Sequence, residues 1–486
     1  LPQSKPDGFA SSLGEGASGV PANLALTPET ANPSGETVVQ KRPQAFLNHK
    51  YKNIFPLNMA RAQAEVIPNR PAPALQSFSR NDTIRPNRNA PLPGFPVREK
   101  EANHMSMNTV PERLAALRAA MAANGVAVYL IPVGDPHASE YLPCHYTSLT
   151  WFSGFHGENS NFVVTRTESA LWADGRYFVQ AEKEIAGTEI KLQRMGEPGV
   201  PTVEEYCANA LNEGEALGLC GLTASTALVN DLKKALEKKG ASIKTLNLED
   251  ELWTEGRPAL PDTPAWILPK EYAGFSPAEK LDQLRSKLKE LGCTAQFVGK
   301  LDNLAWLLNL RAMDIECTPY AMAYCYVTPS RAVLFINTAR VTPEAKAELE
   351  ANGITLAEYD DVLKFLAAET EPQTVLAECS TVNYAVYQVL EQNPALTVKD
   401  GTDPLLMMKG VKNETELAHT KQAHIRDAVA MVRFQIELES RLAAGETLTE
   451  LTVDEILHKY RSADDKFLVE SFGTIAAYGG NAAMMH

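Results

Sequence analysis

The sequence predicts an α/β protein in which one α/β domain occurs twice, between a disordered N-terminal tail and a C-terminal α+β segment. Two helix-then-strand patterns with matching caps indicate the repeat, and a concentration of prolines indicates the tail. Two amphipathic helix signals after residue 411 indicate the last segment. A chain of 486 residues is long enough for two to four domains of ordinary size.

The net charge and the spacing of the cysteines exclude several classes of function. The chain has 46 basic and 60 acidic residues, so its net charge of -14 repels phosphate backbones and anionic lipid. We therefore expect neither a nucleic-acid nor a membrane partner, and no apolar run reaches the roughly 18 residues of a membrane span. The seven cysteines are scattered without CxxC spacing, which favours a reducing, cytoplasmic location over a disulfide framework or a zinc site.

Residues 1–105 form the predicted disordered tail. The first 104 residues hold 14 of the 31 prolines and neither cysteine nor tryptophan. Proline at this density blocks helices and removes backbone donors, and too few apolar side chains remain to offset the ordering entropy. A Pro-rich docking arm is the alternative interpretation of this stretch.

The first α/β copy starts at Thr109. Thr109 and Glu112 form a capping box, and Pro111 presets the first helical turn. Gly125 supplies the stop of this helix, and residues 126–131 follow as a buried strand. Between the cap and the stop, apolar side chains recur at helical spacing: Leu114, Leu117 and Met121.

The same order of signals returns in a second copy. Ser276 and Glu279 cap a helix that ends at Gly292, and residues 294–298 form the next strand. The helix carries an apolar stripe of Leu281, Leu284 and Leu288. Residues 165–172 and 328–335 also share a strand–turn–strand pattern at similar offsets. An internal repeat explains these matches, and two unrelated domains with common caps are the alternative.

The C-terminal segment is predicted to be helical and then strand-like. Asn413 caps a helix with an acidic first turn that ends at Gly445, Thr452 caps a second helix, and residues 472–477 form a strand. The first helix carries an apolar stripe: Ile425, Val429, Val432 and Ile436. Because one strand cannot bury the faces of two amphipathic helices, we expect further chain to complete this domain.

Seven motifs in a fixed order resemble the three-domain, cytosolic type of the aminopeptidase P family, metallopeptidases with a creatinase/prolidase "pita-bread" fold. Each motif alone is weak, and the ordered set is specific. They are DPHASEY at 135–141, WFSGFHG at 151–157, LWADGRYF at 171–178, LWT at 252–254 with RP at 257–258, LDNLAWLLNLR at 301–311, VKNETEL at 411–417 with AHIRD at 423–427, and SFGTIAAYGGNAAMMH at 471–486.

The resemblance implies two creatinase-like α/β domains, at residues 106–258 and 272–409, and the start of a pita-bread catalytic domain at 411–486. It further implies two divalent metal ions, expected to be manganese, held by carboxylates and a histidine. In the family those ligands follow the position of His486, so the chain as given is expected to be an inactive fragment without a metal site. A homodimer is compatible with the complete protein.

The implied activity is release of the N-terminal residue from peptides with proline at the second position. By resemblance, His486 is the catalytic candidate, with an imidazole that donates or accepts a proton near neutral pH. Trp306 and Arg311 are substrate-binding candidates that border the cleft, with core packing as their alternative role. A non-catalytic peptide- or protein-binding module and a creatinase-type amidinohydrolase remain as alternative functions.

Other polar residues have simpler explanations. His424 and Asp427 can pair on a helix face without catalysis, and His419 is five residues from His424, a poor spacing for a shared metal. Asp174 precedes a glycine and is expected in a tight turn between strands.

Overall fold

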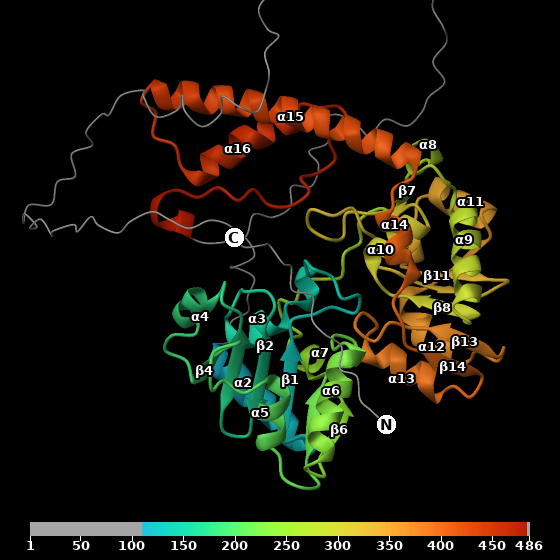
Figure 1. Cartoon of the computed structure of the whole chain (residues 1–486). Helices are drawn as coiled ribbons and strands as arrows, with labels where there is room; N and C mark the ends of the chain where they lie inside the picture. Colours follow the sequence, from blue (N-terminus) through green and yellow to red (C-terminus); the bar gives the residue numbers. More distant parts are fainter. Residues whose placement is uncertain (1–108, 484–486) are drawn as a thin grey trace, which may run out of the picture. The chain divides into compact units, whose positions relative to one another are not determined.

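The computed structural model of this protein describes residues 109–483 (Figure 1). The predicted tail at 1–105 and the predicted catalytic His486 lie outside the described residues. The described part contains two α/β domains followed by a pair of helices, which confirms the α/β fold class with tandem domains.

The first domain is built on a six-stranded mixed sheet with the order β4-β3-β2-β1-β5-β6. Its strands are β1 (Val128–Pro132), β2 (Asn161–Thr165), β3 (Ser169–Ala173), β4 (Ile190–Arg194), β5 (Ala216–Leu219) and β6 (Ser242–Thr245). Its helices are α2 (Val110–Ala123), α3 (Ser148–Ser153), α4 (Phe178–Glu184), α5 (Val203–Asn209), α6 (Thr226–Glu237) and α7 (Leu248–Leu252).

The second domain has a six-stranded sheet with the order β12-β11-β10-β8-β13-β14, and a separate two-stranded pair, β7 with β9. Its strands are β7 (Trp266–Ile267), β8 (Ala295–Val298), β9 (Leu310–Arg311), β10 (Tyr324–Val327), β11 (Ala332–Phe335), β12 (Ile354–Ala357), β13 (Gln373–Leu376) and β14 (Leu396–Lys399). Its helices are α8 (Lys270–Ala273), α9 (Pro277–Glu290), α10 (Leu301–Leu307), α11 (Pro343–Ala351), α12 (Val362–Ala367), α13 (Tyr384–Gln392) and α14 (Pro404–Gly410).

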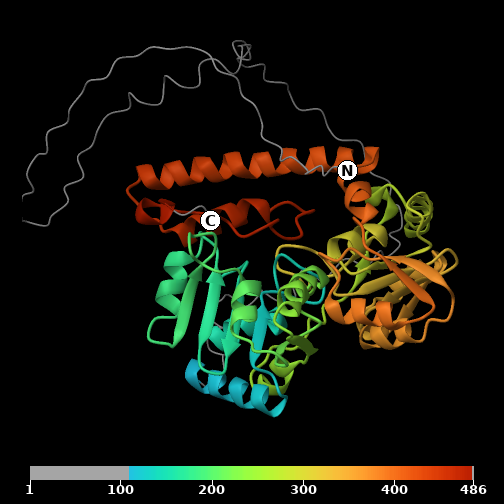
Figure 2. The same cartoon turned by 60° about the horizontal axis from the view of Figure 1, so that its bottom comes forward.

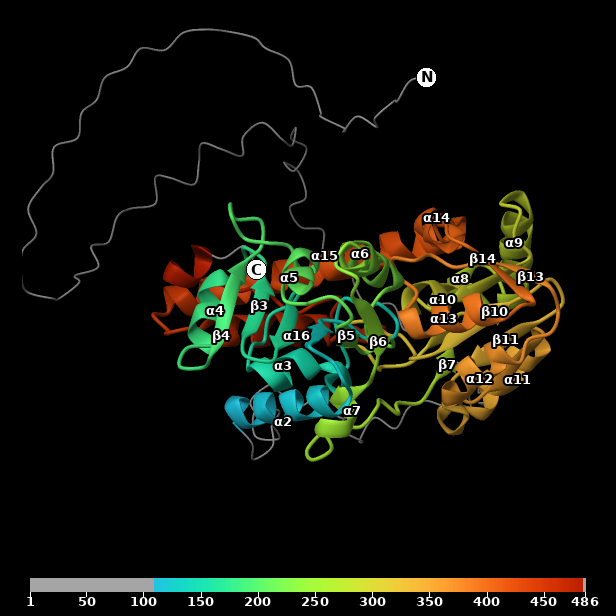
Figure 3. The same cartoon turned by 90° about the horizontal axis from the view of Figure 1, so that it is seen from below.

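Helices cover both faces of the first sheet. Figure 3 shows α2, α3 and α7 on one side of the strands and α5 and α6 on the other. Leu114 and Leu117 of α2 belong to one apolar core, and Val229 and Leu232 of α6 belong to another, so each sheet face has its own core. The two capping boxes at the starts of α2 and α9 form as predicted, with Glu112 and Glu279 each at the third helical position.

The two domains have the same sheet topology, as the internal repeat predicts. In both sheets the first strand pairs antiparallel on one side and parallel on the other, with the same arrangement continued to each edge. One side-chain contact is repeated as well. Arg118 Nε donates to the carbonyl oxygen of Thr165 at 2.9 Å, and Arg285 Nε donates to that of Thr328 at 3.0 Å.

The copies meet through equivalent positions. Ser225 and Asn383, the N-caps of α6 and α13, form an antiparallel bridge with each other. The backbone N–H after each cap donates to the carbonyl before the other: Thr226 to Val382 at 3.0 Å and Tyr384 to Ala224 at 2.9 Å. Such reciprocal bonding is the pattern of a two-fold symmetric dimer interface, here formed within one chain.

The C-terminal helices are α15 (Glu414–Ala443) and α16 (Glu450–Arg461), which lie side by side in Figures 1 and 2. Asn413 caps α15 as predicted. The predicted cap of α16 at Thr452 is wrong, because Thr449 Oγ1 accepts from the Thr452 N–H and α16 starts at residue 450. The predicted strand at 472–477 is also wrong, since no strand forms at these residues.

The apolar stripe of α15 is exposed. The side chains of Ile425, Val429, Val432 and Ile436 are 46–64% accessible to solvent. Although α15 has 30 residues, no helix within 109–483 is apolar enough over a sufficient length to cross a membrane.

Candidate functional site

Trp306, a predicted substrate-binding residue, joins the second domain to α15. It lies in α10, and its indole Nε1 donates to Glu416 Oε1 at 2.9 Å. Glu416 is in the first turn of α15, where its Oε2 accepts from the backbone N–H of Asn413 at 3.0 Å. Asn413 Oδ1 in return accepts from the Glu416 N–H at 2.9 Å. One carboxylate therefore closes the helix cap and holds the indole.

Lys280 of α9 fixes Trp306 from the other side. Its Nζ donates to the Trp306 carbonyl oxygen and to Asn309 Oδ1, both at 2.8 Å, and lies 4.3 Å from the centre of the indole ring. A desolvated cation over an aromatic face is attracted to it electrostatically. Burial lowers the pKa of Lys280 to about 8, although the nearby Glu416 carboxylate acts in the opposite direction.

The turn between α10 and β9 depends on Asn309. Its φ of +53° is in the left-handed region, which asparagine tolerates better than most residues. Asn309 Nδ2 donates to the carbonyl oxygen of Phe275 at 2.9 Å, while its Oδ1 accepts from Lys280. The turn is thus tied to the segment before α9, and it sets the position of the next strand.

Arg311, the other predicted substrate-binding residue, lies in that strand, β9. Its Nη1 donates to the carbonyl oxygens of Ala305 and Leu310 at 2.6 and 2.9 Å. Burial lowers the pKa of Arg311, with Tyr320 and Glu416 opposing that shift. Among residues 109–483, no hydrogen-bond acceptor contacts its Nε or Nη2. The guanidinium therefore keeps donors for another group.

The described residues do not fit the two-metal centre that the resemblance implies. Within 109–483, no group of three or more His, Cys, Asp or Glu side chains is close enough together to hold a metal ion. Hard divalent ions need several oxygen or nitrogen ligands around one point. Residues 109–483 therefore supply the junction around Trp306 and Arg311 but no metal site.

The remaining sequence candidates have structural partners. Asp427 binds Arg461 of α16 at 2.7 Å rather than His424, so the predicted helix-face pair does not form. His419 Nε2 is 3.1 Å from the carbonyl oxygen of Glu271. Asp174 lies in a tight turn between β3 and α4, rather than between two strands, and Arg176 lowers its pKa to about 2.

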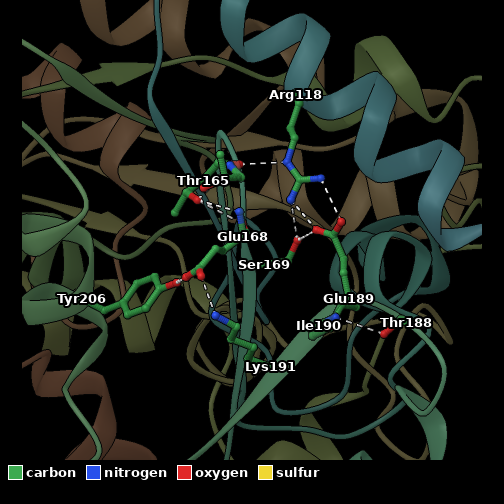
Figure 4. A network of polar contacts seen from close by, with 10 residues as sticks. Arg118, Thr165, Glu168, Ser169, Thr188, Glu189, Ile190, Lys191 and Tyr206 are labelled. Atoms are coloured by element: carbon green, nitrogen blue, oxygen red, sulfur yellow. Dashed lines mark hydrogen bonds and ion pairs between the residues drawn. The ribbon is translucent and has the colours of Figure 1, made fainter.

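Figure 4 shows a polar network at the edge of the first sheet, and the role of this network is structural. Arg118 donates to the Thr165 carbonyl, to Ser169 Oγ at 3.0 Å and to both oxygens of Glu189. Arg118 also holds the pKa of Glu189 below its usual range. Every charged group drawn there has a partner in the network, so it leaves no group to act on a ligand.

Sequence reasoning missed Lys280 and Glu416 as parts of the junction. Lys280 offered a weak signal, because it precedes Leu284 and Leu288 at four-residue spacing and so falls in line with the apolar stripe of α9. The sequence predicts Glu416 only as part of the acidic first turn after Asn413. Its second contact joins residues 110 positions apart, which no local pattern predicts.

Comparison with known proteins assigns both α/β domains. Family models described as "Creatinase/Prolidase N-terminal domain" match residues 113–252 and residues 256–416. Aminopeptidase P2 of Arabidopsis thaliana is 34% identical over 409 residues, which cover 78% of this chain and 58% of that protein. Xaa-Pro aminopeptidase app-1 of Caenorhabditis elegans is 32% identical to this chain, and the match covers 64% of that protein.

A solved structure agrees with these matches. An X-prolyl aminopeptidase from Caenorhabditis elegans, described as a cytosolic enzyme with a di-nuclear active site, superposes with a TM-score of 0.72 at 31% identity. The match covers 78% of this chain and 64% of that one. The chain thus spans about three-fifths of the length of the relatives described here.

Proposed function

Because the chain belongs to the aminopeptidase P family, with two creatinase/prolidase N-terminal domains in tandem, we propose that it acts within a metal-dependent Xaa-Pro aminopeptidase. Such an enzyme releases the N-terminal residue that precedes a proline. One observation carries the proposal, the 34% identity to aminopeptidase P2 over 78% of this chain. The relatives are named as peptidases, which favours this function over an amidinohydrolase or a non-catalytic binding module.

The complete active site is proposed to hold two divalent metal ions, with manganese as the expected metal. The di-nuclear site in the Caenorhabditis elegans enzyme supports the number of ions. Residues 109–483 provide no ligand group for them. We therefore propose that this part of the chain hydrolyses no peptide by itself and that the metal ligands come from residues outside 109–483.

The junction residues are proposed to position the catalytic domain. Lys280, Trp306 and Glu416 connect α9, α10 and α15, so they orient the first helix of that domain relative to the second α/β domain. Arg311 is proposed to bind substrate, because its Nε and Nη2 have no hydrogen-bond acceptor within 109–483 and a peptide carbonyl or carboxylate accepts such donors well.

His486 is proposed as the catalytic histidine beside the scissile bond, where a neutral imidazole can donate or accept a proton. A cytoplasmic location is proposed as well. All seven cysteines are free thiols, and five of them are buried, as expected in a reducing compartment. A homodimer of the complete protein stays a proposal, to be tested by sedimentation.

The test uses the protein purified from its native source, with its intact mass and C-terminal peptide determined first. With manganese added, it should release alanine from Ala-Pro-Ala and leave Ala-Ala-Ala uncut, and a chelator should abolish the release. Replacing His486 by asparagine should lower kcat by about 100-fold or more. Equal cleavage of both peptides, or no cleavage by a protein whose mass extends well beyond 53.1 kDa, would refute the proposed function.

A further inference from the structure

A cavity of about 210 Å³ lies between the two α/β domains, away from the junction at α15. From the first domain it takes residues that follow the carboxyl ends of β1, β5 and β6, among them Pro136, Cys220 and Asn247. From the second domain it takes Tyr359 and Leu363. In open α/β sheets, the crevice beyond the carboxyl ends of parallel strands is the usual position of a small ligand.

Glu249 lines this cavity and carries a buried carboxyl group. The residue is only 3% exposed, its Oε2 is bonded to the Tyr129 hydroxyl, and its Oε1 has no hydrogen-bond partner among residues 109–483. The Tyr129 hydroxyl also lies 3.0 Å from the carbonyl oxygen of Leu246 and accepts from the Leu248 N–H at 3.2 Å. Tyr129 has one hydroxyl proton for two acceptors, Glu249 Oε2 and the Leu246 carbonyl oxygen, so the Glu249 carboxylate has at most one donor.

The neighbouring polar groups add further acceptors. His145 Nδ1 donates to the carbonyl oxygen of Pro258 at 2.8 Å, which leaves Nε2 of this cavity residue as an acceptor. Arg257, the cation of the wall, already donates through Nε to the His145 carbonyl at 3.1 Å and through Nη1 to Asp250. Within residues 109–483, Glu249 Oε1 and His145 Nε2 are therefore acceptors of the wall that no donor reaches.

We propose that this cavity binds a small organic cation with an apolar or aromatic body, whose ammonium group donates to Glu249. The body lies against the aromatic and aliphatic part of the wall, Tyr146, Tyr324 and Leu363. A dry cavity of about 150 Å³ is known to hold a benzene ring, so about 210 Å³ accommodates a ring and a short aminoalkyl group. Leu260 and Asp360 line the cavity and are exposed, which gives a ligand access from solvent.

The probe for this site is benzylamine, with benzyl alcohol as its neutral counterpart of nearly equal shape. Calorimetric titration of the full chain at pH 7 should give a dissociation constant of about 1 mM or below for benzylamine. Benzyl alcohol should bind at least about tenfold more weakly, because it brings one donor and no charge. Equal affinity of the two probes, or no binding of benzylamine at 1:1 stoichiometry, would overturn the proposal.

Matched variants locate the binding. Glu249→Gln should weaken benzylamine binding at least about tenfold and leave benzyl alcohol nearly unchanged. Glu251→Gln removes the same charge from an exposed position of the same helix, α7, and should bind as the wild type does. If Glu249→Gln binds benzylamine with wild-type affinity, the site is not this cavity. Should Glu249→Gln fail to fold, Leu363→Trp, which fills the cavity from the second domain, must abolish binding instead.

Proton release gives an independent readout. Burial raises the pKa of Glu249 to about 7, and the titratable groups that face it are Tyr129, Cys220, Asp250 and Arg257. An ammonium ligand requires the ionised carboxylate, so binding near pH 7 should release about half a proton. Titrations in phosphate and in Tris should therefore give different apparent enthalpies for benzylamine and equal ones for benzyl alcohol. Identical enthalpies for benzylamine in the two buffers would contradict an ion pair with Glu249.

Discussion

The indole N–H of Trp306 donates to the carboxylate of Glu416 at 2.9 Å, across 110 positions of sequence. The same carboxylate accepts from the backbone N–H of Asn413, the N-cap of α15. The start of α15 is therefore fixed by a side chain of the second α/β domain as well as by its own cap. Substitutions in α10 should therefore alter the stability of the first turn of α15.

Trp306→Phe tests this coupling. The ring stays under Lys280, but the hydrogen bond to an ionised Glu416 is lost, at a cost of about 1.5–3 kcal/mol. Amide hydrogen exchange over residues 414–418 should become about tenfold to a hundredfold faster. Trp266→Phe is the matched control, because the half-buried Trp266 makes no indole hydrogen bond within the described residues. Equal exchange in wild type and Trp306→Phe would show that the cap alone holds the helix.

Because burial lowers the pKa of Lys280, we expect the free energy of unfolding to depend on pH. The pKa of Lys280 is about 8 in the folded protein and about 10.4 when unfolded, so between these values the unfolded state binds more protons. Stability relative to Lys280→Met should therefore rise from pH 8 to pH 10.4, by about 3 kcal/mol, and be flat below pH 8. Denaturant titrations across this range measure the difference. Lys289→Met, at an exposed position of the same helix, should show no such rise.

The repeated arginines predict parallel effects in the two domains. Arg118→Met and Arg285→Met each remove a bond to the carbonyl that ends a central strand, at Thr165 and at Thr328. Arg118→Met should cost more, about 2–3 kcal/mol against about 1 kcal/mol, because Arg118 also binds Ser169 and both oxygens of Glu189. The further contacts of Arg285 are weaker: an exposed pair with Asp282 and a 3.5 Å contact with the Arg331 carbonyl oxygen. Hydrogen exchange of the two strand–turn–strand units reports each loss separately.

The control for this pair lies in the same network (Figure 4). Lys191 pairs with Glu168 on the surface, with both side chains about half exposed. Lys191→Met should therefore change stability by less than about 1 kcal/mol. A larger effect there than at Arg118 would contradict the assigned roles.

Local signals predicted most of the fold, because they describe contacts between neighbouring residues. The capping boxes at Thr109 and Ser276 need only the residue three positions along, and both form. The signal failed at Thr452, where an equally good cap, Thr449, stands three residues earlier and captures the Thr452 N–H. The strand expected at 472–477 failed because a strand needs a partner, which sequence pattern alone does not supply.

The candidate site was harder to predict from the sequence than the fold was. Trp306 and Arg311 came from the ordered family motifs, and their assignment to substrate binding stays a prediction. Lys280 joins the site through α9 and Glu416 through α15, two elements brought together only by the tertiary fold. The donors that Arg311 retains also follow from packing, since its sequence neighbours do not determine which N–H groups are satisfied.

Gly274→Ala tests the junction from the side of α8. Gly274 has φ of +80°, and a Cβ there would lie 2.5 Å from Asn413 Oδ1, the atom that caps α15. Alanine should therefore displace the cap and cost about 1–2 kcal/mol for the lost cap, in addition to backbone strain of about 1 kcal/mol or more. Gly292→Ala separates these contributions, because Gly292 has φ of +68° but a Cβ added there would meet no atom within 4 Å. Both variants should lose stability in thermal unfolding, and only Gly274→Ala should speed hydrogen exchange in the first turn of α15. Faster exchange there in Gly292→Ala as well would mean that strain, rather than the Gly274–Asn413 contact, controls the start of the helix.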